Sequence, residues 1–219
     1  MKTKRESYIP ALRFHWLTRW YDPLIQWGMR EAAFKGHLVR QARVQSGQQV
    51  LDLACGTGTL TLMIKQTQPA AQVTGLDADP EILAIAREKA ARQGVHLAFD
   101  KGMSYDLPYP DRSFDHVFSS LFFHHLTREK KRKTLNEVYR VLRPGGGLHI
   151  IDFAQPHNRW MRVAFLSVQL LDGFEPTRDH VSGLLPHFIE DAGFQAVRET
   201  ARFSTILGTL RAYSAQKPF

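Results

Sequence analysis

The chain has 219 residues, of which 43% are hydrophobic and 23% are charged, and its formal net charge is +8. These fractions are ordinary for a globular protein, and the length suits one domain with a sizeable core. A single cysteine, Cys55, excludes a disulfide framework and a zinc–thiolate site, and no run of about 18 apolar residues predicts a membrane-spanning helix.

The first 44 residues are expected to form a helical extension that covers the substrate. They carry many aromatic and aliphatic side chains, which commonly line small-molecule pockets. The charged start is not followed by an apolar run of signal-peptide type, so we expect a cytoplasmic protein. A basic cluster in this segment suits peripheral contact with an anionic membrane surface. Its members are Lys2, Lys4, Arg5, Arg13 and Arg19.

Between residues 49 and 153, short apolar runs alternate with helical patterns, which predicts βα units around a parallel sheet. The second helix is expected to begin at the N-cap Asp79 and to stop at Gly94. The third is capped by Thr127 and starts with a basic run, residues 128–133, which we interpret as a solvated face. No nucleic-acid motif accompanies this run, so no nucleic-acid partner is expected. Strands are expected at residues 50–53, 72–76, 95–99, 114–119 and 148–153.

The C-terminal part of the chain departs from this alternation. Residues 160–171 predict a helix with little polar face, which should be buried or line a pocket. Residues 182–192 predict another helix, and strands are expected at 194–203 and 207–215. Because their connection is so short, these two strands should pair antiparallel. The chain is therefore divided into a segment 1–44 and a domain 45–219.

A glycine-rich turn, Ala54-Cys55-Gly56-Thr57-Gly58, lies between the first strand and the first helix of the domain. Glycine permits backbone conformations and a close approach that a side chain would prevent. A ligand at this place meets backbone N–H groups at a helix N-terminus. It also lies outside the carboxyl ends of the strands, where α/β sheets bind their ligands.

Two cofactor classes use such a turn. A dinucleotide site favours Gly-x-Gly-x-x-Gly, and here the third glycine is replaced by Thr61. Asp52, at the end of the strand, disfavours a pyrophosphate and suits the ammonium group of S-adenosylmethionine. Asp77 ends the second strand, and its carboxylate can accept both ribose hydroxyls. The combination favours S-adenosylmethionine, although Asp52 would also suit a helix cap.

The glycine-rich turn and Asp77 are followed along the chain by three further motifs, residues 106–110, 113–115 and 142–146. In this order the motifs resemble the class I S-adenosylmethionine-dependent methyltransferases, most of all the branch with the ubiquinone/menaquinone C-methyltransferases. The resemblance covers roughly residues 45–155. It implies an α/β, Rossmann-like fold with a seven-stranded, mostly parallel sheet, an antiparallel last strand and helices on both faces, plus the N-terminal helical extension. The segments that carry it are residues 52–58, Asp77, and residues 106–110, 113–115 and 142–146.

The resemblance implies contacts to the nucleoside end of the cofactor. Gly56 and Gly58, with Ala54 in the same turn, become a backbone cradle. Asp77 becomes the ribose ligand, and Ala78 lies beside the adenine.

It also implies contacts to the methionine end. Ser119 and Ser120, after the fourth strand, fall where the backbone of relatives meets that end. Tyr21 resembles an N-terminal tyrosine that closes over the cofactor and takes part in the reaction.

The adenine contact departs from the pattern of the family. Relatives often carry Gly-Asp-Ala where this chain has Gly102-Met103-Ser104, and the aspartate there binds the adenine amino group. Methionine is a poor acceptor for that hydrogen bond. We therefore expect Met103 to pack on the adenine while a backbone group or Ser104 meets its edge.

His124 and His125 follow the fourth strand, near the expected position of the methyl group, and are candidate bases. A base is needed only if the accepting atom starts protonated. The alternative is that one histidine packs and the other makes a local hydrogen bond. His180, beside Asp179, is expected on the solvated surface, and we expect no bound metal.

The sequence therefore predicts an enzyme that transfers a methyl group from S-adenosylmethionine to a small apolar acceptor such as a quinol, with S-adenosylhomocysteine as the second product. One alternative is a phospholipid amine N-methyltransferase at a membrane surface. Another is a non-catalytic module that binds the cofactor. A nicotinamide-dependent oxidoreductase is disfavoured by the missing third glycine.

Overall fold

The computed structural model describes residues 31–219, so the expectations for Tyr21 and for the rest of residues 1–30 lie outside the described residues. The strands are β1 (Gln49–Leu53), β2 (Gln72–Asp77), β3 (Ala98–Lys101), β4 (Phe114–Ser120), β5 (Leu142–Phe153), β6 (Gln195–Thr205) and β7 (Gly208–Gln216). The helices are α2 (Glu31–Ala42), α3 (Thr59–Thr67), α4 (Pro80–Arg92), α5 (Arg128–Val141), α6 (Arg159–Asp172), α7 (Phe174–Val181) and α8 (Leu185–Asp191). A short 3₁₀ turn, η2 (Phe123–His125), follows β4.

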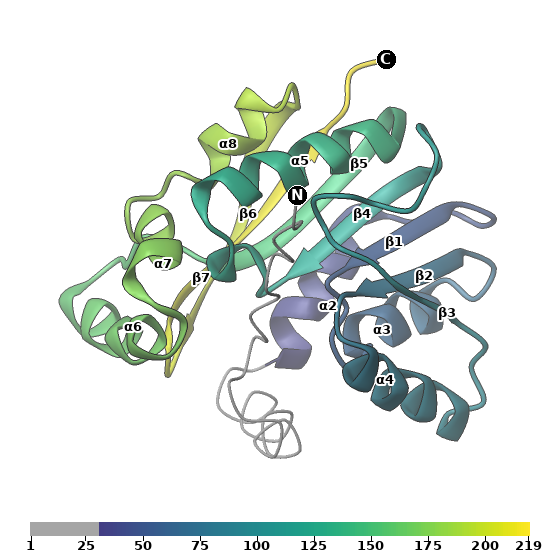
Figure 1. Cartoon of the computed structure of the whole chain (residues 1–219), viewed down its shortest axis with the longest axis horizontal. Helices are drawn as coiled ribbons and strands as arrows, with labels where there is room; N and C mark the ends of the chain where they lie inside the picture. The colour runs from purple at the N-terminus through teal and green to yellow at the C-terminus, as the bar shows by residue number, and fades with distance from the viewer. Residues whose placement is uncertain (1–30) are drawn as a thin grey trace, which may run out of the picture.

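The strands form one seven-stranded sheet in the order β3-β2-β1-β4-β5-β7-β6 (Figure 1). β1 to β5 pair in parallel, while β7 is antiparallel to both β5 and β6. The predicted fold, with its parallel sheet and antiparallel terminal pair, is confirmed. The strand order places β1 and β4 side by side at the centre, where the direction of chain winding reverses. In open α/β sheets this switch point is the place where ligands bind.

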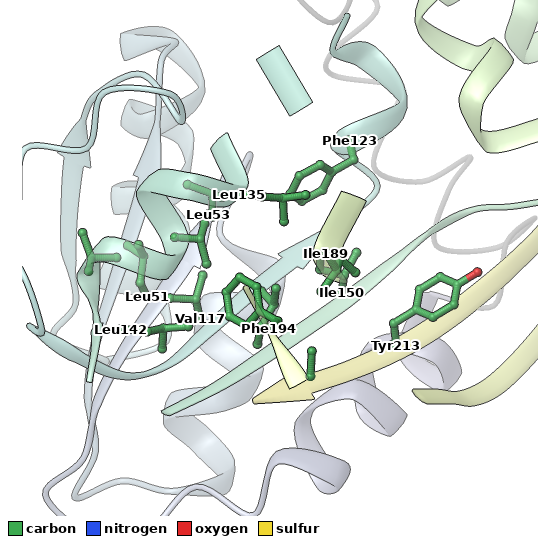
Figure 2. Close-up of a cluster of buried hydrophobic side chains, with 14 of the residues drawn as sticks. Leu51, Leu53, Val117, Phe123, Leu135, Leu142, Ile150, Ile189, Phe194 and Tyr213 are labelled. Atoms are coloured by element: carbon green, nitrogen blue, oxygen red, sulfur yellow. The ribbon is translucent and has the colours of Figure 1, made fainter. Parts of the chain in front are cut away.

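Helices cover both faces of the sheet because its strands are apolar on both sides. Leu51 of β1 and Val117 of β4 belong to a core closed by Leu135 of α5 and by α8 (Figure 2). Val50 and Phe118, the neighbours of these residues in the chain, point to the opposite core, which α2, α3 and α6 close. The period of two in a strand therefore distributes adjacent residues between two cores.

The predicted helix starts are confirmed. The Asp79 carboxylate caps α4 by accepting hydrogen bonds from the backbone N–H groups of Glu81 and Ile82, and Pro80 takes the first helical position. The Thr127 hydroxyl caps α5 by accepting from Lys130 N. Such caps satisfy backbone donors that have no partner within the helix.

Two predicted boundaries are wrong. The expected helix 182–192 begins only at Leu185, as α8, because Gly183 takes a left-handed conformation (φ +70°) and Pro186 lies in the first turn of the helix; α7, which ends at Val181, was not predicted. The third strand covers Ala98–Lys101 rather than 95–99, since Val95 still closes the end of α4 by donating to the Ala90 carbonyl.

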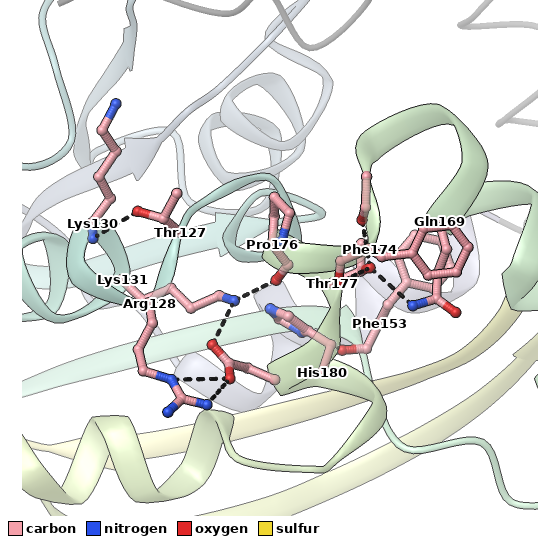
Figure 3. Close-up of polar contacts among 12 residues, drawn as sticks. Thr127, Arg128, Lys130, Lys131, Phe153, Gln169, Phe174, Pro176, Thr177 and His180 are labelled. Atoms are coloured by element: carbon pink, nitrogen blue, oxygen red, sulfur yellow. Dashed lines mark hydrogen bonds and ion pairs between the residues drawn. The ribbon is translucent and has the colours of Figure 1, made fainter.

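Two predictions of burial are also wrong. The apolar helix α6 was expected to be buried or to line a pocket, yet Trp160 is 80% exposed and Leu170 is 75% exposed. The basic run of α5 was interpreted as a solvated face, yet Lys131 within it is fully buried. Its ammonium group donates to the Pro176 carbonyl at 2.6 Å and to Asp179 at 3.2 Å (Figure 3). The partners on α7 explain this burial, because a charge leaves water only when it is paired.

Within residues 31–219, no helix has both the length and the apolar character needed to cross a membrane.

Candidate site at the carboxyl edge of the sheet

The candidate site lies where β1, β2, β4 and β5 end. Because these strands are parallel, their carboxyl ends meet at one edge of the sheet. The edge carries the glycine-rich turn after β1, Asp77 after β2, the two serines that end β4, and the histidines of η2. The fold therefore brings together the site residues that the sequence suggested within residues 31–219.

The two glycines of the turn serve different purposes. Both have positive φ angles, +55° for Gly56 and +74° for Gly58. A Cβ on Gly58 would lie 3.1 Å from Ala86 and from the ring of Phe99, whereas a Cβ on Gly56 would have no described atom within 4 Å. Gly58 is thus required for the packing of α4 and β3 against the turn. Gly56 faces open space and is the glycine that a ligand can approach.

Ala54 shares the unusual backbone of this turn, with φ +56°, and is half-buried. Left-handed backbone is costly for a residue that has a Cβ. Such strain commonly gathers at ligand sites. Cys55 packs beside Phe99 and Leu83, as expected for a small core residue.

Asp77 holds the turn in place. Its Oδ2 accepts a hydrogen bond from Gly56 N at 2.9 Å, and its Oδ1 accepts from Asp79 N at 3.1 Å. Burial raises the pKa of this carboxyl, while the hydrogen bonds from Asp79, Gly56 and Ala78 oppose the rise. Each carboxylate oxygen has two lone pairs, so each can still accept one hydrogen bond from the hydroxyls of a diol. Ala78 is half-buried beside it.

Asp52 is a buried carboxyl at the same edge, with 1% exposure. Burial raises its pKa to about 6, although the hydroxyl of Thr61 donates to its Oδ2 at 2.6 Å and favours the charged form. The charge of Lys35 acts in the same direction as Thr61. A cationic ligand beside Asp52 would offset the desolvation of the carboxylate. The residue therefore suits an ammonium group better than a phosphate.

Ser119 and Ser120 end β4 beside the glycine-rich turn, since Ser119 is in register with Leu53. Their hydroxyls are buried and have no hydrogen-bond partner in the described part of the chain. A buried hydroxyl without a partner is unfavourable, so such groups usually indicate a missing ligand or water. This observation fits a polar ligand at the end of β4.

The residues near the expected adenine position are tied to β2 and α5. Gly102 N donates to the Asp77 carbonyl at 3.0 Å, which holds the following residues close to the end of β2. Met103 is half-buried. The hydroxyl of Ser104 is buried and shares a 2.9 Å hydrogen bond with Thr134 of α5. The side chain of Met103 takes no part in this hydrogen bond between Ser104 and Thr134.

These features fit S-adenosylmethionine. A carboxyl that favours a cation suits its ammonium group, and a carboxyl with acceptors for a diol suits its ribose. The open glycine leaves room for it, and the two unpartnered hydroxyls suit its polar methionine end. The contacts of all these residues with the cofactor stay predictions, those of Ala54, Ala78, Met103 and Ser104 included.

His124 is paired with a residue that the sequence analysis missed. Its Nδ1 lies 2.6 Å from Oδ1 of Asp152, near the end of β5, and Asp152 Oδ2 accepts from Phe122 N at 3.1 Å. Burial alone would raise the pKa of Asp152. The charges of His124 and His180, together with hydrogen bonds, outweigh burial and hold that pKa well below its usual range. The signal was available, because Asp152 ends a predicted strand as Asp52 and Asp77 do.

The other two histidines at this edge differ in burial. His125 is half-buried, and its ring centroid lies 4.0 Å from that of His124. His180 was expected at the solvated surface, and this is wrong: it is 1% exposed and donates from Nδ1 to the Phe153 carbonyl at 2.6 Å. Burial lowers the pKa of His180 to about 4, although Asp152 opposes the shift. His180 is therefore neutral near pH 7.

Comparison with known proteins agrees with this geometry. Residues 50–146 match a family model described as a methyltransferase domain. The demethylmenaquinone methyltransferase of Thermus thermophilus is 43% identical over 109 residues, which are 50% of this chain and 49% of that protein. The enzyme of the same name from Symbiobacterium thermophilum is 32% identical over 167 residues, 74% of this chain and 65% of that protein. The matches thus span about half to two thirds of the length of these relatives.

Among solved structures, a SAM-dependent methyltransferase from Methanosarcina mazei has a TM-score of 0.67 at 22% identity. The alignment covers 83% of this chain and 97% of that one, which supports the shared fold. The cofactor of such enzymes, S-adenosylmethionine, is the molecule that the edge of the sheet fits. Residues 50–146 are therefore a methyltransferase domain, and the fold is that of the S-adenosylmethionine-dependent methyltransferases.

Proposed function

We propose that this chain transfers the methyl group of S-adenosylmethionine to an apolar, quinol-like acceptor, and that His124 serves as the base. The observation that carries the proposal is the buried Asp152–His124 pair at the carboxyl edge, next to the glycine-rich turn. The names of the matched relatives, which are demethylmenaquinone methyltransferases, support a quinol as the acceptor.

The hydrogen bond to Asp152 determines which nitrogen of His124 is basic. A carboxylate with a low pKa is ionised and can only accept, so Nδ1 of His124 carries the shared proton. In the neutral imidazole the other nitrogen, Nε2, then has the lone pair. The carboxylate also stabilises the imidazolium that forms when Nε2 takes a proton, as in other carboxylate–histidine pairs.

The cofactor supplies a methyl group activated by a positively charged sulfur. The acceptor hydroxyl gives its proton to His124, and the electron-rich ring carbon forms the new bond to the methyl group. The sulfur–methyl bond breaks and leaves its electron pair on sulfur. Loss of the hydrogen from the methylated ring carbon as a proton restores the aromatic ring, and the oxygen takes its proton back from His124, so one proton is released overall. The protein contributes alignment and proton removal.

The proposal is tested with radiolabelled methyl transfer by the full chain. The arms contain a reduced naphthoquinol with an apolar side chain, the same compound in its oxidised form, and phosphatidylethanolamine vesicles. We expect label in the naphthoquinol and none in the quinone, because the oxidised ring has no hydroxyl proton to lose. Label only in phosphatidylethanolamine would overturn the proposal in favour of a phospholipid N-methyltransferase.

The same experiment separates an enzyme from a binding module. Binding of S-adenosylhomocysteine is measured by calorimetry on the same preparation. Tight binding with no label in any arm would contradict the proposed activity and support a module that only binds the cofactor.

A further inference from the structure

The outward side of α6 is apolar although it faces solvent. Trp160, Val163, Leu166 and Leu170 recur at three- to four-residue spacing, so they lie on one side of the helix. They are all exposed, from 38% for Leu166 to 80% for Trp160. The opposite side is also apolar, since Phe165 and Val168 are buried against the sheet. Exposed apolar side chains gathered on one side of a helix are typical of an interaction surface.

Two neighbouring side chains extend this surface. Phe174, at the start of α7, is 56% exposed, and Ile206, in the turn between β6 and β7, is 60% exposed. The start of β7 is close to α6, because a Cβ on Gly208 would lie 3.3 Å from the ring of Phe165. Figure 1 shows α6, α7 and the β6–β7 turn together at one end of the molecule. We call Trp160, Val163, Leu166, Leu170, Phe174 and Ile206 the α6 apolar surface.

The charges around the surface are mostly positive. Arg159 at the start of α6 and Arg178 on α7 are exposed, with Glu175 as an exposed acid between them on α7. The whole chain carries a net charge of +8. A second copy of this chain carries the same charge and would be repelled at long range, whereas an anionic lipid surface would be attracted. Exposed tryptophan beside basic residues is typical of contact with the polar–apolar boundary of a bilayer.

The surface opens on the same side as the candidate site. β6 runs in the direction of β5 because both are antiparallel to β7, so Ile206 lies at the carboxyl edge. The segment after β5 is joined to the start of β7 there, since Ala154 N donates to the Thr209 carbonyl at 3.0 Å and His157 Nδ1 lies 2.8 Å from Thr209 Oγ1. A bilayer against α6 would therefore face the edge where the acceptor enters.

We propose that the α6 apolar surface docks on the surface of an anionic lipid bilayer. Docking places the carboxyl edge beside the lipid, so an acceptor dissolved in the bilayer reaches the site without crossing bulk water. This last consequence rests on the proposed function, while docking itself does not.

The test is flotation of the full chain with vesicles, without cofactor or acceptor. One set contains phosphatidylcholine and phosphatidylglycerol in a two-to-one ratio, and the other contains phosphatidylcholine alone. We expect binding to the first set and much weaker binding to the second. Replacing Trp160→Ser together with Leu170→Ser should raise the lipid concentration for half-binding about tenfold or more. Ile85→Ser on α4, which removes another exposed aliphatic side chain, should leave binding unchanged.

Tryptophan fluorescence gives a second measurement. The spectrum of the protein minus that of Trp160→Phe should shift to the blue when anionic vesicles are added, since this variant keeps an apolar ring but loses the indole. Unchanged flotation of the Trp160/Leu170 double variant, or equal binding to both vesicle sets, would overturn docking. So would a change from dimer to monomer in the double variant by analytical ultracentrifugation, because the surface would then belong to a second copy. Since no methyl transfer is measured, failure here leaves the proposed reaction to its own test.

Discussion

Asp152 Oδ1 lies 2.6 Å from His124 Nδ1, and this contact joins the end of β5 to the turn that follows β4. The two residues are 28 positions apart in the chain. Both side chains are almost completely buried. A pair of this kind fixes the orientation of the imidazole and the nitrogen that carries its proton.

Replacing Asp152→Asn should lower kcat by about 10²–10⁴, because an amide neither fixes the tautomer nor stabilises the imidazolium. The acidic limb of the pH–rate profile should also move to lower pH, since the carboxylate charge that favours the imidazolium is lost. Affinity for S-adenosylhomocysteine should stay within a few-fold. His116→Gln, at a histidine farther back on β4, is the control and should keep the limb in place. A variant Asp152→Asn with a normal pH profile would remove His124 from the role of base.

Replacing Asp77→Asn should weaken binding of S-adenosylhomocysteine about 10- to 100-fold. The amide has only one acceptor oxygen, so Gly56 N and the ribose diol then compete for hydrogen bonds to that oxygen. Calorimetry measures this change. Asp100→Asn is the matched control, because Asp100 lies in the next strand and its Oδ2 accepts from the hydroxyl of Tyr109 at 2.9 Å. Equal affinity in both variants would contradict the ribose assignment.

Asp52 should make the stability of the free protein depend on pH. Its pKa in the folded protein is about 6, against 3.8 for the ordinary group. Between these values the unfolded chain has already lost a proton that the folded protein keeps, so the free energy of unfolding falls as pH rises from about 4 to about 6. Asp52→Asn removes this fall and should be about 1–3 kcal/mol more stable relative to the parent at pH 7 than at pH 4.

Urea unfolding at both pH values tests this prediction. The same variant should bind S-adenosylhomocysteine more weakly, because the ammonium loses its anionic partner. If the free energy of unfolding changed equally with pH in the parent and the variant, Asp52 would be ionised at little cost in the free protein, and the prediction would be wrong.

The two glycines of the turn should respond differently to alanine. Gly58→Ala should cost about 2–4 kcal/mol of stability, since the new Cβ meets Ala86 and Phe99 in addition to the strain of a positive φ. Gly56→Ala should cost only about 1–2 kcal/mol, from backbone strain alone.

Affinity for the cofactor separates Gly56 from a purely structural glycine. Gly94→Ala, which has a φ of +67° and open space around its Cβ, carries the same strain away from the site and is the control. We expect Gly56→Ala, but not Gly94→Ala, to weaken binding of S-adenosylhomocysteine in calorimetry. Similar affinities for the two variants would place the ligand away from Gly56.

Lys131 should matter for folding although it lies in a run of basic residues. Lys131→Ala leaves a cavity and takes one cation away from Asp179, which retains Arg128, so we expect a loss of about 2–4 kcal/mol in urea unfolding. Lys133→Ala, two residues along on α5, breaks an exposed pair with Glu129 and should cost about 0.5 kcal/mol or less. Equal losses of stability in the two variants would show that the buried ammonium group of Lys131 stabilises the fold no more than the exposed one of Lys133.

The sequence by itself determined the sheet and the edge at which the cofactor is expected to bind. Strand and helix periods, the caps Asp79 and Thr127, and the glycine-rich turn are local features, so they are readable without the fold. Asp52 and Asp77 could also be placed together, because the carboxyl ends of parallel strands meet at one edge. Residues 1–30, with Tyr21, lie outside the described structure, so the lid stays a prediction.

Only the tertiary structure decided which partner each buried polar group has. Asp152 meets His124 across two strands, Lys131 meets Asp179 across two helices, and His180 lies in the core rather than at the surface. The same holds for α6, whose apolar pattern is typical of burial but which has only one side against the sheet. Hydrophobic pattern and residue type report a preference for burial, whereas the contacts that satisfy a charge or leave an apolar side open depend on residues far away in the chain.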